Sequence, residues 1–299
     1  MKADQKAARQ PDQITDQINR KPAIGELSFE QKLWKGGQTM LQSLRPVALY
    51  LCLPALLMSV GMVLFGGRSA EAVIGDSGNF YYTLGIMLTM YMLHKRSRKR
   101  GSTLWEECTL EYRGLSLKRA ALLGAAGLGF AVFFSSVITV VPFPRGLMDS
   151  YHSSSDGLRN GTDIGLAMIS TVVLAPVAEE VVFRGYMLGR LLRWFTQKQA
   201  VWICAVVFAL CHVSLLWMVY ACFMGLLLAW VCIREDNIAY SIALHVGFNA
   251  SVIPVQFINS RGAWREAVFG SGFRIALLGG VMLFLAVLAL GRYRREEII

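Results

Sequence analysis

The sequence predicts an all-α protein, a polytopic membrane helical bundle of about eight transmembrane helices with both termini in the cytoplasm. Hydrophobic residues make up 55% of the 299 residues and charged residues only 17%, against about 25% charged residues in an ordinary soluble domain. The apolar residues fall into separate runs near the length of roughly 20 residues that a membrane-spanning helix needs. Lysine and arginine gather in alternate connecting segments, as in membrane proteins.

The N-terminal segment is expected to lie outside the bilayer core. Residues 1–22 are rich in Gln, Asp, Lys and Arg, a composition typical of a disordered cytosolic tail. Residues 24–45 carry apolar side chains seven residues apart, such as Trp34 and Leu41, among lysines, and this predicts a helix lying in the membrane interface. The first apolar run begins near Val47, which is too late for a cleavable signal peptide, so we expect it to stay as a span.

Eight apolar runs follow, each bounded by charged or turn-forming residues. Their residue ranges are 47–65, 79–93, 119–141, 163–183, 200–215, 217–233, 238–256 and 273–291. The fifth and sixth runs are separated by very little, so their division stays open at this stage. With eight spans, 24 of the 30 Lys and Arg residues lie on the cytoplasmic side and 6 on the other. A seven-span arrangement would place one basic end outside, against this charge rule.

Net charge bears on the expected binding partner, and cysteine spacing bears on zinc sites and disulfides. The net charge is +10 and the isoelectric point about 9.5, which in a soluble protein would suggest nucleic acid. Here the basic residues flank membrane spans, so we expect contact with membrane lipid and no nucleic-acid partner. The six cysteines include no CxxC pair, so neither a structural zinc site nor a disulfide framework is predicted.

The stretch "PVAEEVVFRGYML", residues 176–188, places two glutamates and an arginine inside an apolar run. Each charge at the bilayer centre costs about 2.5–3.5 kcal/mol on insertion scales, so these side chains are expected to face protein or water. Glu180 and Arg184 are four residues apart and share one helix face, where they can pair. Glu179 is turned by about 100° from Glu180. The stretch therefore predicts one ion pair and one separate carboxylate.

Two further polar pairs occur in apolar runs. "FALCH" places Phe208 and His212 four residues apart, which predicts a shared helix face, and "HVGFN" does the same for His245 and Asn249. Polar groups on three helices are expected to converge on one internal cavity. A glutamate and a histidine near one water form a general base, and a second histidine with an asparagine amide can donate to an oxyanion. The set predicts a water-activating hydrolase without a covalent nucleophile.

The ordered motifs "EEVVFR", "FALCH" and "HVGFN", within about residues 160–255, resemble the type II CAAX prenyl protease family, also called the CPBP or ABI family. The resemblance implies an intramembrane endopeptidase of the cell membrane (inner or plasma membrane), which cuts a membrane-anchored peptide or protein. Eukaryotic members of the family cleave after a prenylated cysteine and bacterial members need not, so a prenylated CAAX-type substrate stays open. The composition and the apolar runs, together with the resemblance, divide the chain into a tail with a possible interfacial helix at 1–46, N-terminal transmembrane helices at 47–141, and a catalytic core with the C-terminal span at 142–299.

The resemblance also implies catalytic roles. Glu179 and His212 would activate the water that attacks the peptide bond. His245 and Asn249 would stabilise the oxyanion of the tetrahedral intermediate.

Glu180 and Arg184 would orient this site and balance its charge, in line with their helical spacing. The family has been described both as metalloprotease and as glutamate-dependent protease. One glutamate and two histidines form a known catalytic zinc set, but no HExxH motif is present, so we expect catalysis without a cofactor and keep zinc as the alternative.

Two other functions compete with the protease. A non-catalytic membrane protein, such as an immunity or scaffold factor, would keep the same polar side chains for packing. A proton-coupled transporter would use buried glutamate and histidine as a relay, although the sequence shows no inverted repeat.

Overall fold

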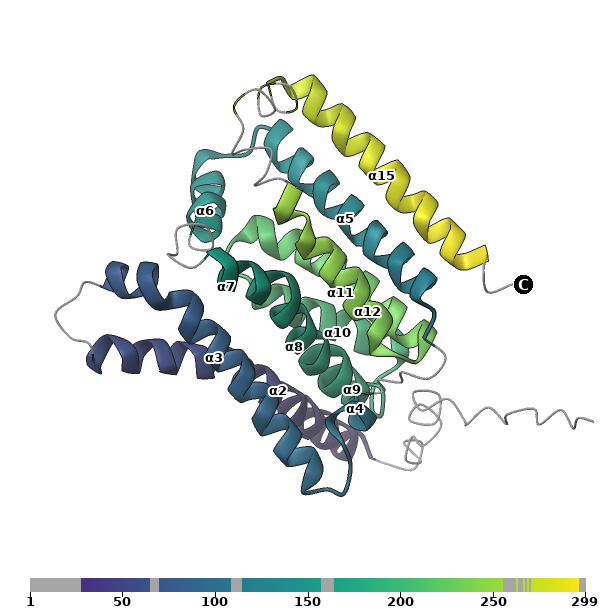
Figure 1. Ribbon diagram of the computed structural model, residues 1–299. Helices are drawn as coiled ribbons and strands as arrows, with labels where there is room; N and C mark the ends of the chain where they lie inside the picture. Colours follow the sequence, from purple (N-terminus) through teal and green to yellow (C-terminus); the bar gives the residue numbers. More distant parts are fainter. Residues whose placement is uncertain are drawn as a thin grey trace, which may run out of the picture.

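The computed structural model describes residues 28–64, 70–108, 115–156, 164–254, 262, 266, 268 and 270–295. Within these ranges the secondary structure is helical and contains no strand (Figure 1). The predicted all-α class is therefore confirmed. The expected tail at residues 1–22 lies outside the described residues.

The helices follow one another along the chain with short connections. Their bounds are α2 (Phe29–Leu64), α3 (Ala70–Arg98), α4 (Leu104–Glu107), α5 (Leu117–Val140), α6 (Arg145–Asp156), α7 (Ile164–Ile169), the π-helix η2 (Ser170–Leu174), α8 (Ala175–Glu179), the π-helix η3 (Glu180–Leu188), α9 (Gly189–Leu191), α10 (Gln197–Leu210), α11 (Leu215–Glu235), α12 (Ile238–Ala250) and α15 (Gly272–Arg295). The described part of each predicted apolar run overlaps one helix or one continuous series of helices.

In the part of the chain that the structure describes, five helical stretches are long and apolar enough to cross a membrane. They are Phe29–Leu64, Leu117–Val140, Gly165–Leu191, Leu215–Glu235 and Gly272–Arg292. The apolar helices Gln197–Leu210 and Ile238–Pro254 are shorter, and 14 residues of α-helix reach only about 21 Å against about 30 Å of hydrocarbon. These findings support a multi-pass membrane protein, while the count of eight spans and the cytoplasmic termini stay predictions.

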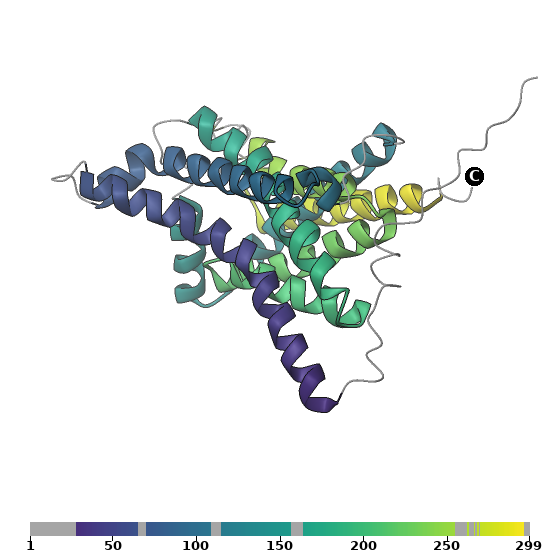
Figure 2. The same cartoon turned by 90° about the horizontal axis from the view of Figure 1, so that it is seen from below.

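Helix α2 joins two segments that the sequence separates. The described part of the predicted interfacial helix and the first predicted span form one continuous helix, with no interruption near residue 46. Two prolines, Pro46 and Pro54, lie inside α2 without ending it. Pro54 packs closely against Gly85 of α3, where an added side chain would collide with the proline ring. Figure 2 shows the N-terminal part of α2 extending away from the other helices.

A short turn separates α10 from α11. Helix α10 ends at Leu210, and α11 begins at Leu215 after the cap residue Ser214. The fifth and sixth predicted runs are therefore distinct helices. His212 lies in this turn, two residues beyond the end of α10, and its backbone N–H donates to the carbonyl of Ala209. Its ring still contacts the ring of Phe208, so the two side chains lie together as the spacing predicts.

Helix α5 lies between α12 and α15, with the three helices side by side (Figure 1). A Cβ atom added at Gly127 of α5 would collide with the backbone of Leu244 and Phe248 in α12, and one added at Gly247 would collide with the backbone of Gly124. The two helix backbones therefore touch without side chains between them. In space, α5 packs mainly against α12 and α15 in the C-terminal part of the chain rather than against α2 and α3.

This close approach predicts a stability effect. Gly127→Ala is expected to lower the free energy of unfolding by about 1–3 kcal/mol, because its methyl group meets backbone atoms that cannot move aside singly. Thermal unfolding of the detergent-solubilised protein measures the loss. Gly280→Ala in α15 is the matched control, since nothing lies within 4 Å of its added Cβ. Equal unfolding temperatures for the two variants would contradict the packing.

Candidate active site

The continuous helical stretch from Ile164 to Leu191 carries both glutamates and is called the glutamate helix below. It alternates between α-helical and π-helical winding. α8 lies between the π-helices η2 and η3, so Glu179 is the last residue of α8 and Glu180 the first of η3. Pro176 has no N–H and cannot complete an α-helical hydrogen bond. Just before it, the N–H of Ala175 donates to the carbonyl of Ser170, five residues back. Short π segments of this kind frequently occur at functional sites.

Glu180 and Arg184 form the ion pair that their spacing predicts. Nη1 of Arg184 lies 2.8 Å from Oε1 of Glu180, and both side chains are fully buried. Nη2 of Arg184 donates to the backbone carbonyl of Gly225 in α11 at 3.2 Å, and the guanidinium lies 4.6 Å from the ring centre of Phe208. The arginine therefore connects three helices while neutralising Glu180.

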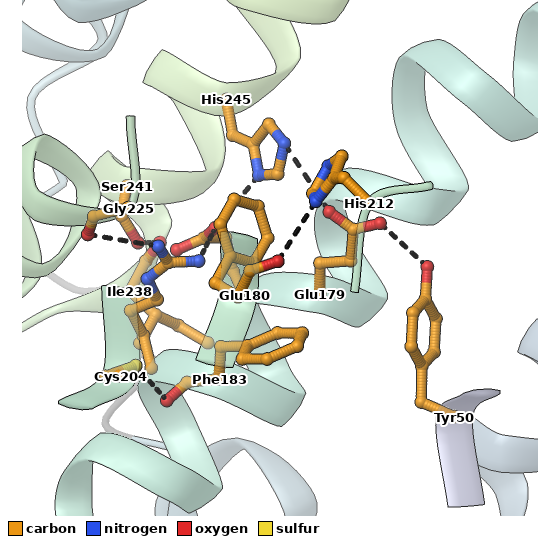
Figure 3. Close-up of polar contacts among 12 residues, drawn as sticks. Tyr50, Glu179, Glu180, Phe183, Cys204, His212, Gly225, Ile238, Ser241 and His245 are labelled. Carbon is orange, nitrogen blue, oxygen red and sulfur yellow. Dashed lines mark hydrogen bonds and ion pairs between the residues drawn. The ribbon is translucent and has the colours of Figure 1, made fainter. Parts of the chain in front are cut away.

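His245 contacts both glutamates, one with each ring nitrogen (Figure 3). Its Nδ1 is 2.9 Å from Oε1 of Glu180, and its Nε2 is 3.6 Å from Oε2 of Glu179. A carboxylate oxygen only accepts hydrogen bonds, so Nδ1 carries the proton in the contact with ionised Glu180. Glu179 is the less buried of the two, with 16% of its side chain exposed. As predicted, it stands apart from the ion pair.

His212 approaches the same space from the turn after α10. Its Nδ1 lies 3.0 Å from the backbone carbonyl of Phe208. Because a carbonyl only accepts, Nδ1 carries the proton and Nε2 is the basic nitrogen of the neutral ring. The Phe208 ring contacts both histidines, with centroid distances of 5.1 Å to His212 and 5.8 Å to His245. Figure 3 shows His212 and His245 on the same side of Glu179.

Asn249 lies one turn after His245 in α12, and its described contact is with the helix before the glutamates. Nδ2 of Asn249 donates to the backbone carbonyl of Thr171 at 2.9 Å. An amide nitrogen carries two hydrogens, so one N–H is used for this contact and the second remains for another acceptor. The contact holds the amide against η2, the part of the glutamate helix that precedes the two glutamates.

Two tyrosines at the site were missed by the sequence analysis. The hydroxyl of Tyr50 in α2 donates to Oε1 of Glu179 at 2.8 Å, and the hydroxyl of Tyr82 in α3 lies 3.2 Å from that of Tyr50. Their only signal in the sequence is a hydroxyl within an apolar run. Tyrosine is amphipathic and common near membrane interfaces, so this signal does not single them out.

The donor geometry gives no support to a metal centre. In the described part of the chain, no group of three or more His, Cys, Asp or Glu side chains is arranged to hold a metal ion. Glu179, His212 and His245 lie near one another but do not form such a set. Catalysis without a metal stays a prediction.

Comparison with known proteins finds one family model that matches the central part of the chain. Residues 162–251 match the family model described as type II CAAX prenyl endopeptidase Rce1-like. All six predicted site residues lie within the match, whereas α2, α3, α5 and α15 lie outside it. No curated protein and no solved structure matches the chain significantly. The family suggests a CAAX-type intramembrane protease.

Proposed function

We propose, from the premise that residues 162–251 form a domain of the Rce1-like family of type II CAAX prenyl endopeptidases, that this protein hydrolyses a peptide bond of a membrane-anchored substrate. One observation carries the proposal. Arg184 neutralises Glu180, while the adjacent Glu179 remains a separate carboxylate facing His245. A spare carboxylate beside an imidazole is the arrangement needed to activate water.

Glu179 is the proposed general base. Its Oε2 and the Nε2 of His245 are 3.6 Å apart, so one water lying to the side of this gap can contact both atoms. Glu179 takes a proton from that water as its oxygen adds to the carbonyl carbon, and the proton then passes to the leaving amine nitrogen. The basic Nε2 of His212, fixed by the contact of its Nδ1 with Phe208, is the second proton acceptor.

His245 and Asn249 are the proposed donors to the oxyanion. The Nδ1 of His245 donates to Glu180, so Nε2 is the nitrogen left to donate to the oxyanion, which it does in the protonated form of the ring. Asn249 contributes the amide hydrogen that Thr171 does not use. Donors fixed by protein contacts before the substrate arrives need no reorganisation as negative charge develops.

The position of the site within a candidate membrane span supports a membrane-anchored substrate. The site helix lies within the candidate span Gly165–Leu191, so a peptide cut there has to be held at or in the bilayer by an anchor. We propose that membrane lipid and a lipid-anchored or membrane-embedded peptide are the partners, in the cell membrane. The reacting bond would be approached from the cytoplasmic side, to which the charge distribution assigns the basic segments.

The proposal is tested by cleavage in vesicles. We expect the purified protein to cut a quenched fluorescent peptide ending in a prenylated CAAX sequence, with the products identified by mass spectrometry and an unmodified peptide run in parallel. His245→Ala is expected to lower kcat by about a hundredfold, since it removes a donor to the oxyanion.

His94→Ala is the matched control, because His94 is exposed at the end of α3 and is expected to leave the rate unchanged. Failure of the wild type to cut either peptide would reject the protease and favour the non-catalytic alternative. An unchanged kcat in His245→Ala would show that His245 takes no part in the reaction.

A further inference from the structure

We infer that Tyr50 is a positioning residue of the active site, which holds the Glu179 carboxylate in place, and that Tyr82 acts through Tyr50. The inference rests on the proposed role of Glu179 as general base. Both tyrosines belong to the N-terminal hairpin of α2 and α3, outside the segment that matches the family. The hairpin therefore contributes to the chemistry and does more than anchor the protein.

The two carboxylate oxygens of Glu179 make different contacts, and Tyr50 binds one of them. The hydroxyl of Tyr50, which is 5% exposed, donates to Oε1 at 2.8 Å, while Oε2 faces His245. A glutamate side chain has three rotatable bonds, and a catalytic group has to be held close to its productive geometry. The tyrosine fixes one oxygen, which leaves the other aimed at the water.

The direction of the hydrogen bonds indicates that Tyr82 donates to Tyr50. The single hydroxyl hydrogen of Tyr50 points to Glu179, because an ionised carboxylate only accepts. The contact of 3.2 Å between the two hydroxyls therefore has Tyr82 as donor and the Tyr50 oxygen as acceptor. The result is a chain from Tyr82 through Tyr50 to Glu179, in which each bond strengthens the next.

Two other buried contacts show that α3 is fixed along the glutamate helix. The hydroxyls of Thr83 and Ser170 lie 2.6 Å apart. Farther along α3, the hydroxyls of Ser97 and Tyr186 also lie 2.6 Å apart. These contacts lie on either side of the Tyr50 site and set the register of the hairpin. Tyr50 thus reaches Glu179 from a docked helix pair and not from a loose segment.

Tyr50→Phe tests the positioning role because it keeps the ring and removes only the hydroxyl. With the prenylated CAAX peptide as substrate, kcat is expected to fall about ten- to a hundredfold, the value of a hydrogen bond to a charged group. KM is expected to stay unchanged, since the hydroxyl contacts Glu179 and not the substrate. Tyr91→Phe, an exposed tyrosine of α3, is the matched control.

Tyr82→Phe separates a relay from simple packing. Alone it is expected to lower kcat severalfold, and in the Tyr50→Phe background it is expected to have no further effect, because its route to Glu179 is already broken. Independent, multiplicative losses would overturn the relay. A rise in KM with unchanged kcat for Tyr50→Phe would overturn the positioning role.

The outcomes also separate this inference from the proposed function. If Glu179→Gln is inactive but Tyr50→Phe keeps the wild-type kcat, the protease proposal stands and the positioning role is rejected. A second measurement needs no substrate: a double-mutant cycle of Tyr50→Phe and Glu179→Ala, read from the unfolding temperature in detergent. Tyr50→Phe is expected to lower that temperature less in the Glu179→Ala background, and strictly additive shifts would overturn the contact.

Discussion

Glu179→Gln is expected to lower kcat by about a thousandfold, within the range of 10²–10⁴ for loss of a general base. Glutamine has nearly the same shape as glutamate, but its amide cannot accept a proton from water at neutral pH. Substrate binding is expected to remain, so KM changes little. The measurement is cleavage of the prenylated CAAX peptide by equal amounts of vesicle-inserted protein.

The folded state of this variant is expected to survive, because the buried ion pair belongs to Glu180 and Arg184 and not to Glu179. Glu30→Gln, at an exposed position of α2, is the matched control and should keep the wild-type rate. Undiminished cleavage by Glu179→Gln would assign the base to another group and remove the central element of the proposed mechanism.

Arg184→Met is expected to destabilise the protein by about 3–5 kcal/mol, because it leaves the fully buried charge of Glu180 without its partner. It also removes the contacts to the Gly225 carbonyl and to the Phe208 ring. The loss is measured as a lowered unfolding temperature in detergent. Arg98→Met, an exposed residue at the end of α3, is the control for loss of one positive charge.

A second substitution tests whether the charge itself is responsible. Adding Glu180→Gln to Arg184→Met is expected to restore most of the lost stability, since replacing both members of a buried pair is often close to neutral. A double variant as unstable as Arg184→Met alone would show that packing around the guanidinium dominates. Activity is not expected to return, because His245 loses the carboxylate contacted by its Nδ1.

Local features of the site could be predicted from the sequence. The pair of Glu180 and Arg184 depends only on a spacing of four within one helical stretch, and the structure forms it despite the π-helical winding. The separate direction of Glu179 follows from the same geometry. The position of His212 could not be predicted, because no Gly or Pro marks the end of α10 at Leu210.

Contacts between distant segments could not be predicted from spacing. Tyr50 and Glu179 are 129 positions apart in the chain, and only the packing of α2 and α3 on the glutamate helix brings them together. The continuity of α2 across residue 46 was not predicted either. The composition changes there from a lysine-containing segment to an apolar run, but the helix continues.

The direct backbone contact between α5 and α12 limits how far this protein can be treated as a module. Leu244 and Phe248, whose backbone atoms lie against Gly127, flank His245 and Asn249 in α12. The placement of both side chains is thus tied to a helix that precedes the family-matched segment. A transplanted fragment of residues 162–251 would carry every signature residue yet lack the support of α5. We expect it to be inert, and a working minimal enzyme to require both α5 and the Tyr50 hairpin.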